Sequence, residues 1–175
     1  AARRCTRSTS SGMTGCAALH TLELSFCHRL TDVSALGNIT TLHTLTLYSC
    51  DGLTDVSAFA GCEALHTLDL RSCCLVTDIS ALANCAALHT LDLTMCAGVK
   101  DVSALAGCAA LHTLHLVSCE GVTDISALAN CATLRKLKIG RTGVTDASAL
   151  GGPGPETAPV EVACWVQHFW GGNNS

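Results

Sequence analysis

The chain has 175 residues, which suits one domain, and a formal net charge of −4, which gives no general attraction to nucleic acid or to an anionic membrane. Hydrophobic residues make up 49% of it but aromatic residues only 3%, so Leu, Val and Ala must fill a thin, regular interior. No apolar stretch is long enough to cross a bilayer, and we expect no membrane insertion.

Residues 1–18 are basic and rich in serine, without the apolar run that a secretory signal requires. We therefore expect no signal peptide in this segment. Its last five letters, TGCAA at Thr14–Ala18, match the end of the sequence unit that follows. This match predicts that residues 1–18 form the N-terminal edge of the domain as a degenerate first copy of that unit.

Residues 19–150 repeat one unit of 23 residues six times. The heptapeptide ALHTLDL occurs twice without change, at Ala64–Leu70 and Ala87–Leu93. Such a period predicts a repeat array, in which each unit buries its apolar face only against its neighbours. The copies begin at Leu19, Leu42, Leu65, Leu88, Leu111 and, in altered form, Leu134.

Each unit contains three predicted elements. In the third copy, the apolar–polar alternation of LHTLDL predicts a half-buried strand, and the next residues have no regular period and predict a turn. Ile79 and Leu82 are then spaced for a single helical turn. Either Thr77 or Asp78 stands where a cap would accept the free N–H groups of that turn.

The C-terminal part departs from the pattern. The last copy lacks one residue before Asp146 and has Gly140–Thr142 where the others have a cysteine turn. Residues 151–159 are rich in glycine and proline and predict a linker. The tail that completes residues 151–175 holds half of the chain's aromatic residues and belongs to no copy. It could fold back as a cap over the last coil, as such arrays require, or be disordered.

On these repeats the chain resembles the leucine-rich repeat family. The spacing L-x-x-L-x-L-x-x-C recurs in every full copy, as in Leu65, Leu68, Leu70 and Cys73. The resemblance runs from Cys16 to about Leu150. It implies an α/β repeat fold: a right-handed solenoid with a parallel sheet on the concave face and short helical turns on the convex face.

Two subclasses of that family are similar to parts of the repeat. The continuation C-x-x-[LV]-T-D, with the later C-A-A-L, resembles the cysteine-containing subclass found in F-box substrate receptors. The segment TD[VI]SAL instead resembles the repeats of bacterial internalins and of some trypanosomatid surface and regulatory proteins. The chain therefore mixes features of both subclasses.

Ten of the thirteen cysteines form two columns, at the ninth and twenty-first repeat positions. Equivalent residues in stacked coils lie about 4.8 Å apart but point the same way, which disfavours disulfides. No C-x-x-C pair starts a zinc site. We expect buried free thiols without metal, and hence an intracellular (cytoplasmic) location, with the cell surface as the alternative. The columns are Cys27, Cys50, Cys73, Cys96, Cys119 and Cys16, Cys62, Cys85, Cys108, Cys131; Cys5, Cys74 and Cys164 are expected to be more exposed.

Two further columns contain titratable residues. The histidines at the second position, with Arg135 closing the column, lack the convergent geometry of a metal site and are expected at a solvated edge. The aspartates of the TD[VI]S segments recur in every copy, whereas an active site normally occurs once, so we expect caps. We find no nucleophile elbow, phosphate loop or unique acid–base pair, and expect neither enzyme activity nor a cofactor. The columns are His20, His43, His66, His89, His112 and Asp32, Asp55, Asp78, Asp101, Asp124, Asp146.

The positions that differ between copies indicate where a function would lie. Positions five and seven vary while the leucines hardly change, and strand alternation places both opposite the leucines. We expect a protein partner on this concave face, acidic toward the first coils and basic at the last; neutral drift is the alternative. The predicted binding residues are Glu23, Ser25, Tyr48, Asp69, Arg71, Asp92, Thr94, Met95, His115, Val117 and Lys138.

The sequence thus predicts a non-catalytic protein-recognition scaffold. One alternative is a surface adhesin or host-interaction protein, which the internalin-like segment implies. The other is the substrate-recognition or regulatory arm of a larger enzyme complex such as a ubiquitin ligase, which the F-box resemblance implies.

Overall fold

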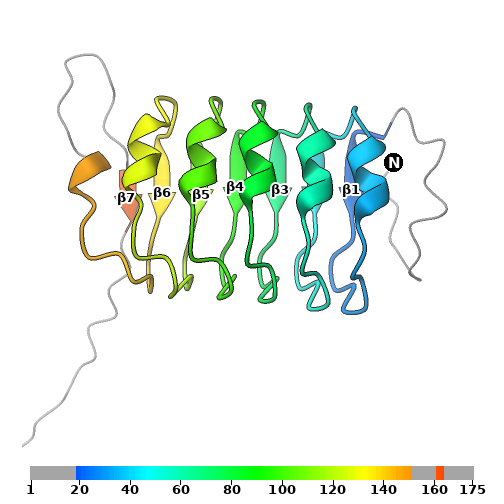
Figure 1. Cartoon of the computed structure of the whole chain (residues 1–175), viewed down its shortest axis with the longest axis horizontal. Coiled ribbons are helices and arrows are strands. Elements are labelled where there is room, and N and C mark those ends of the chain that lie inside the picture. The colour runs from blue at the N-terminus through cyan, green and yellow to red at the C-terminus, as the bar shows by residue number, and fades with distance from the viewer. Residues whose placement is uncertain (1–18, 151–160, 164–175) are drawn as a thin grey trace, which may run out of the picture.

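The computed structural model describes residues 19–150 and 161–163, and these form a right-handed solenoid (Figure 1). Each turn of the solenoid, here called a coil, carries one strand on one side and a short 3-10 helix on the other. One parallel sheet runs along the whole array in the order β1 to β7. The predicted solenoid is confirmed, and its helical turns are of the 3-10 type.

The elements are short and regularly spaced. The strands are β1 (Thr21–Glu23), β2 (Thr44–Thr46), β3 (Thr67–Asp69), β4 (Thr90–Asp92), β5 (Thr113–His115), β6 (Lys136–Lys138) and β7 (Glu161–Ala163). The 3-10 helices are η2 (Ser34–Asn38), η3 (Ser57–Gly61), η4 (Ser80–Asn84), η5 (Ser103–Gly107), η6 (Ser126–Asn130) and η7 (Ser148–Leu150).

The sheet register places equal repeat positions side by side. Leu68, for example, pairs with Leu45 on one side and Leu91 on the other. The ladder continues beyond the strands, because the N–H at the eighth position donates to the carbonyl at the seventh position of the next coil. Each of these eighth residues has a left-handed backbone, with φ between 55° and 64°: Phe26, Ser49, Ser72, Met95, Ser118 and Arg141.

The core is one narrow cluster that runs through all the coils. Eight residues per coil point inward at a spacing of two or three, and in the second coil none of them is more than 1% exposed. Among the described residues, no polar or charged side chain is buried. Such a narrow interior suits leucine, valine and cysteine, as the composition predicts. In the second coil the inward residues are Leu42, Leu45, Leu47, Cys50, Leu53, Val56, Phe59 and Cys62.

The aspartate, and not the threonine, accepts the free N–H at the start of each helical turn, and it stands one residue before the N-cap, which is Ile79 in η4. Oδ1 of Asp78 accepts the backbone N–H of Ser80 at 2.7 Å, and the same bond recurs from Asp32 to Asp146 at 2.7–2.8 Å. Five of the aspartates accept this backbone hydrogen bond and a second one from the hydroxyl of the same serine, and the two bonds lower their pKa. The repeated aspartate is therefore structural in every coil, as expected.

These aspartates should make the fold sensitive to acid. Because their folded-state pKa lies below the unfolded value of about 3.9, ionised aspartate favours folding above that pH, and the contribution is lost as the pH falls through the folded value. We expect the urea midpoint to fall as the pH is lowered from about 5 to 3. The double variant Asp55→Asn/Asp78→Asn can accept the same N–H groups and should show a weaker acid dependence. A wild-type midpoint that stays constant down to pH 3 would contradict this.

At the C-terminal end a seventh strand extends the sheet. Glu161–Ala163 pair in parallel with β6, and the N–H of Ile139 donates to the carbonyl of Ala163 at 3.3 Å. These three residues lie over the edge of the last coil, where a cap would lie. The rest of the predicted linker and tail, and the predicted first copy at 1–18, lie outside the described residues.

Candidate functional site

All eleven predicted binding residues lie in the strands or in the two or three residues that follow them. We call this side of the solenoid the strand face. Glu23, Arg71, Met95 and Lys138 are exposed, and the others are half-buried. Position five lies within each strand, and position seven opens the turn at its end. The variable residues therefore form one continuous strip along the sheet.

A bidentate ion pair occupies the centre of the strip. Nε and Nη2 of Arg71 donate to the carboxylate of Asp69, with Nη2 2.6 Å from Oδ2. The same carboxylate also accepts the backbone N–H of Arg71 at 3.0 Å. These bonds raise the pKa of Arg71. The guanidinium is thus held in one orientation before any partner arrives.

Asp92 connects this ion pair to the next two coils. Its Oδ1 accepts the N–H of Thr94 at 2.9 Å, and its Oδ2 accepts Nδ1 of His115 at 3.0 Å. Nε of Arg71 lies 3.8 Å from the same Oδ2. Polar side chains of three neighbouring coils are therefore joined through one carboxylate.

On the other side of Arg71 the strip is aromatic. The Cζ atom of Arg71 lies 5.0 Å from the ring centroid of Tyr48, over its face. Tyr48 in turn meets Phe26 edge-on, with centroids 4.9 Å apart and an interplanar angle of 72°. Beyond Phe26, Nδ1 of His28 lies 2.8 Å from Oδ2 of Asp51. Sequence reasoning missed Phe26, His28 and Asp51, although all three stand at variable repeat positions.

Met95 stands one position later than Tyr48 and Arg71 in its coil. It lies in the turn, with the left-handed φ of 64° common to this position. Its Sδ is 3.8 Å from Oγ of Ser72, and its carbonyl accepts the thiol of Cys74 at 3.3 Å. The last coil is different again, because Lys136, Lys138 and Arg141 are all exposed there. The strip therefore changes from acidic and aromatic to basic along the array.

The cysteine columns hold neighbouring coils together. The thiol of Cys96 donates to the carbonyl of Leu70 at 3.0 Å, and that of Cys85 to the carbonyl of Phe59 at 3.3 Å. The Leu70 carbonyl also accepts the N–H of Cys73, so both of its lone pairs are used. Buried thiols were predicted in both columns; Cys27 is only half-buried, and Cys16 lies outside the described residues. The donor role of the buried thiols was not predicted. The other donors are Cys50, Cys73, Cys119, Cys62, Cys108 and Cys131.

Burial should make these thiols unreactive. It raises the pKa of Cys50 and Cys108 from 9.0 to about 12 and that of Cys85 to about 11, which lowers the thiolate fraction about 100- to 1000-fold. Cys74 is exposed, as predicted. We expect an alkylating reagent at pH 8, with the modified peptides identified by mass spectrometry, to label Cys74 in the native chain long before Cys50, Cys85 or Cys108. Equal rates would contradict the burial of the columns.

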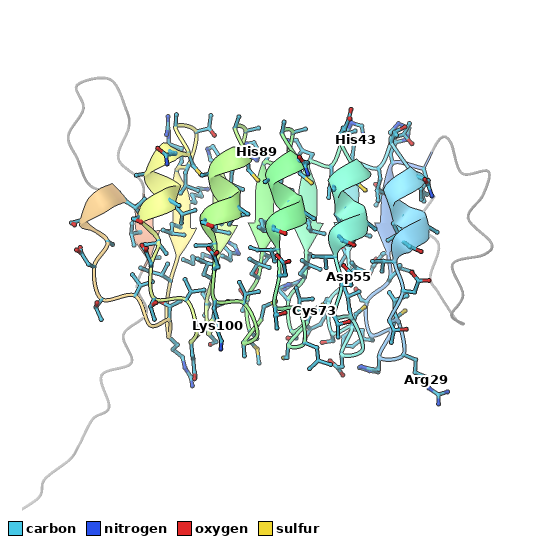
Figure 2. All side chains as sticks on the ribbon, in the orientation of Figure 1. Arg29, His43, Asp55, Cys73, His89 and Lys100 are labelled. Carbon is cyan, nitrogen blue, oxygen red and sulfur yellow. The ribbon has the colours of Figure 1, made fainter. Side chains whose placement is uncertain are left out.

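The histidines line the edge where the chain enters the strands, opposite the edge that carries Arg29 (Figure 2). The rings of His66, His89 and His112 stack at 4.7 Å in nearly parallel planes. His43 is turned, because its Nδ1 donates to the Thr41 carbonyl at 2.8 Å, and it lies at 35° to the ring of His20. Within residues 19–150 and 161–163, no group of three or more His, Cys, Asp or Glu could hold a metal ion. Nor does this part of the chain contain a helix of the length and apolarity needed to cross a membrane.

Comparison with known proteins identifies solved structures of the same architecture. No family model matches the chain, and no curated protein does. An internalin (inlF) from Listeria monocytogenes is 32% identical over 69% of this chain, with a TM-score of 0.55. Internalin C2 (inlC2) from the same organism is 26% identical over 85% of this chain, with a TM-score of 0.54. The chain spans 41% of the length of the first and 72% of the second.

Proposed function

The chain is a leucine-rich repeat protein, and we propose that it is a non-catalytic scaffold that binds a partner protein through the strand face. One observation supports this most. The side chains that differ between coils touch one another in a continuous series, from Phe26 through Tyr48, Arg71 and Asp92 to His115. Five neighbouring coils therefore present a single preformed surface, while the rest of each coil repeats.

The chemistry of this surface suits protein recognition. Tyrosine and arginine are the residue types that most often dominate interface energy, and here each holds the other in place. Side chains that are already ordered lose less conformational entropy on binding. The carboxylates of the first coils and the exposed lysines of β6 favour a partner with separate basic and acidic regions.

Truncation of the central anchors should weaken binding without unfolding the chain. We expect Tyr48→Ala and Arg71→Ala each to cost about 1–3 kcal/mol of binding free energy for a partner isolated with the full chain, measured by calorimetry at two salt concentrations. The melting temperature should change little, because both side chains lie outside the core. Lys100→Ala and Glu63→Ala, which are exposed and lie off the strands, are the controls. If the controls reduce affinity and the strand-face variants do not, the binding face lies elsewhere.

A second candidate function is that of a surface adhesin, which the similarity to two internalins favours. An antibody against the chain that labels intact cells, without permeabilisation, would support it. Labelling only after permeabilisation would favour an intracellular scaffold. The role of a regulatory arm in a ubiquitin ligase has no support beyond the cysteine pattern of the repeat.

A further inference from the structure

Three large apolar side chains are exposed in the turns that follow the strands. Phe26 is 59% exposed, Met95 54% and Leu75 53%. Among the described residues only Val162, at the far end of the sheet, is another large exposed apolar residue. An exposed apolar cluster on one edge of a small domain marks an interaction surface more often than scattered single residues do.

The fold itself does not call for these residues. Phe26 and Met95 occupy the left-handed eighth position, where bulky residues are disfavoured, and three other coils have serine there. Leu75 occupies the eleventh position, where the neighbouring coils have Gly52 and Gly98. A Cβ added at Gly98 would lie 2.5 Å from the carbonyl oxygen of Val76, so this turn is ordinarily tight. Stability therefore gives no reason for large apolar side chains at these places.

Phe26 and Met95 are continuous with the strand face, and Leu75 directly follows Cys74, whose thiol donates to the Met95 carbonyl. Phe26 meets Tyr48 at 4.9 Å, and Tyr48 lies under the guanidinium of Arg71. In the next coil, Met95 contacts Ser72 through its Sδ and Cys74 through its carbonyl. We call Phe26, Tyr48, Leu75 and Met95 the turn ridge.

Carboxylates predominate where the turn ridge borders the sheet. Asp69 and Asp92 lie against the guanidinium of Arg71, and imidazoles lie against two of the carboxylates, His28 against Asp51 and His115 against Asp92. Four carboxylates thus stand beside a single guanidinium. Other cations near this edge are placed differently: Figure 2 shows Arg29 projecting beyond the lower edge and Lys100 below the 3-10 helices. Arg141, at the eighth position of the last coil, lies two coils beyond Met95. The bordering carboxylates belong to Glu23, Asp51, Asp69 and Asp92.

We propose that the turn ridge extends the binding surface and takes an amphipathic segment of a partner protein, with large apolar side chains on the ridge and basic side chains toward the carboxylates. This inference rests on the proposed function, because it names the partner of the same surface. The partner would thus contact both the strand face and the turns that follow the strands.

The test is a selection of random peptides displayed on phage, with the full chain as bait. We expect the enriched peptides to combine large apolar residues with Lys or Arg and to lack Asp and Glu. Synthetic copies should bind Phe26→Ser/Met95→Ser at least 10-fold more weakly in fluorescence anisotropy. This variant should melt no lower than wild type, because serine already serves this position in other coils. Acidic peptides, no enrichment, or equal affinity for the variant would each overturn the proposal.

His115→Ala and Lys138→Ala separate this inference from the proposed function. Both residues lie on the strand face but outside the turn ridge. If these variants weaken binding of the selected peptides and the serine variant does not, the strand face is the binding site and the turn ridge is not part of it. If neither set of variants changes the affinity, both proposals fail.

Discussion

Replacing Phe59 by alanine is expected to lower the free energy of unfolding by about 3–5 kcal/mol. Phe59 is fully buried and stands at the eighteenth repeat position, where the other coils have leucine. The adjacent coils place Leu36 and Leu82 at the equivalent position, both buried in their own coils, so neither is free to fill the cavity. Urea unfolding followed by circular dichroism measures the loss.

Phe59→Leu is the matched control, because it inserts the residue that Leu36 and Leu82 place in the adjacent coils. We expect it to cost less than about 1.5 kcal/mol. The backbone carbonyl of residue 59 still accepts the thiol of Cys85 in both variants, so the comparison isolates side-chain packing. If the alanine variant were no less stable than the leucine variant, the second coil could not be packed as described.

The second large effect is expected on the opposite face, where Gly61→Ala should destabilise the chain although alanine is the better helix former. A Cβ at Gly61 would overlap the carbonyl oxygen of Gly37 in the preceding coil, so η2 and η3 would have to separate. Overpacking of this kind costs about 1–3 kcal/mol, more than the roughly 0.5–1 kcal/mol by which propensity favours alanine. A lower urea midpoint for Gly61→Ala would therefore show that the packing cost is the larger effect, and a higher midpoint would show that helix propensity is.

Asn84→Ala is the control for this variant. Asn84 occupies the same repeat position in η4, and its Cβ is already accommodated there. We expect a change within about 0.5 kcal/mol, as for most exposed substitutions. A stabilised Gly61→Ala variant would mean that neighbouring 3-10 helices lie farther apart than the structure shows.

The sequence by itself determined the period, the fold and the inward-facing residues. The spacing of Leu65, Leu68 and Leu70 repeats in every full copy, and a spacing repeated at one period forces equal positions to stack. Strand alternation then places the variable fifth and seventh positions on the opposite face, as the structure has them. All of this is local information, carried by the order of apolar and polar residues along the chain.

Only the tertiary structure decided how the side chains pair across coils. The sequence shows Arg71 in a column with Tyr48, but only the stacked coils place its guanidinium over the Tyr48 ring. They also bring Nδ1 of His115 within 3.0 Å of the Asp92 carboxylate. The same holds for the thiol of Cys96, which finds a carbonyl 26 residues earlier in the chain.

The left-handed φ at the eighth repeat position could not be predicted from the sequence for a different reason. None of Phe26, Ser49 and Met95 is a residue type that favours a left-handed φ, so the residue types at this position do not predict the turn. The hydrogen-bond ladder imposes it, because each of these residues donates its N–H to the next coil. A single unit contains no next coil, and contacts between coils therefore appear only when the units are stacked.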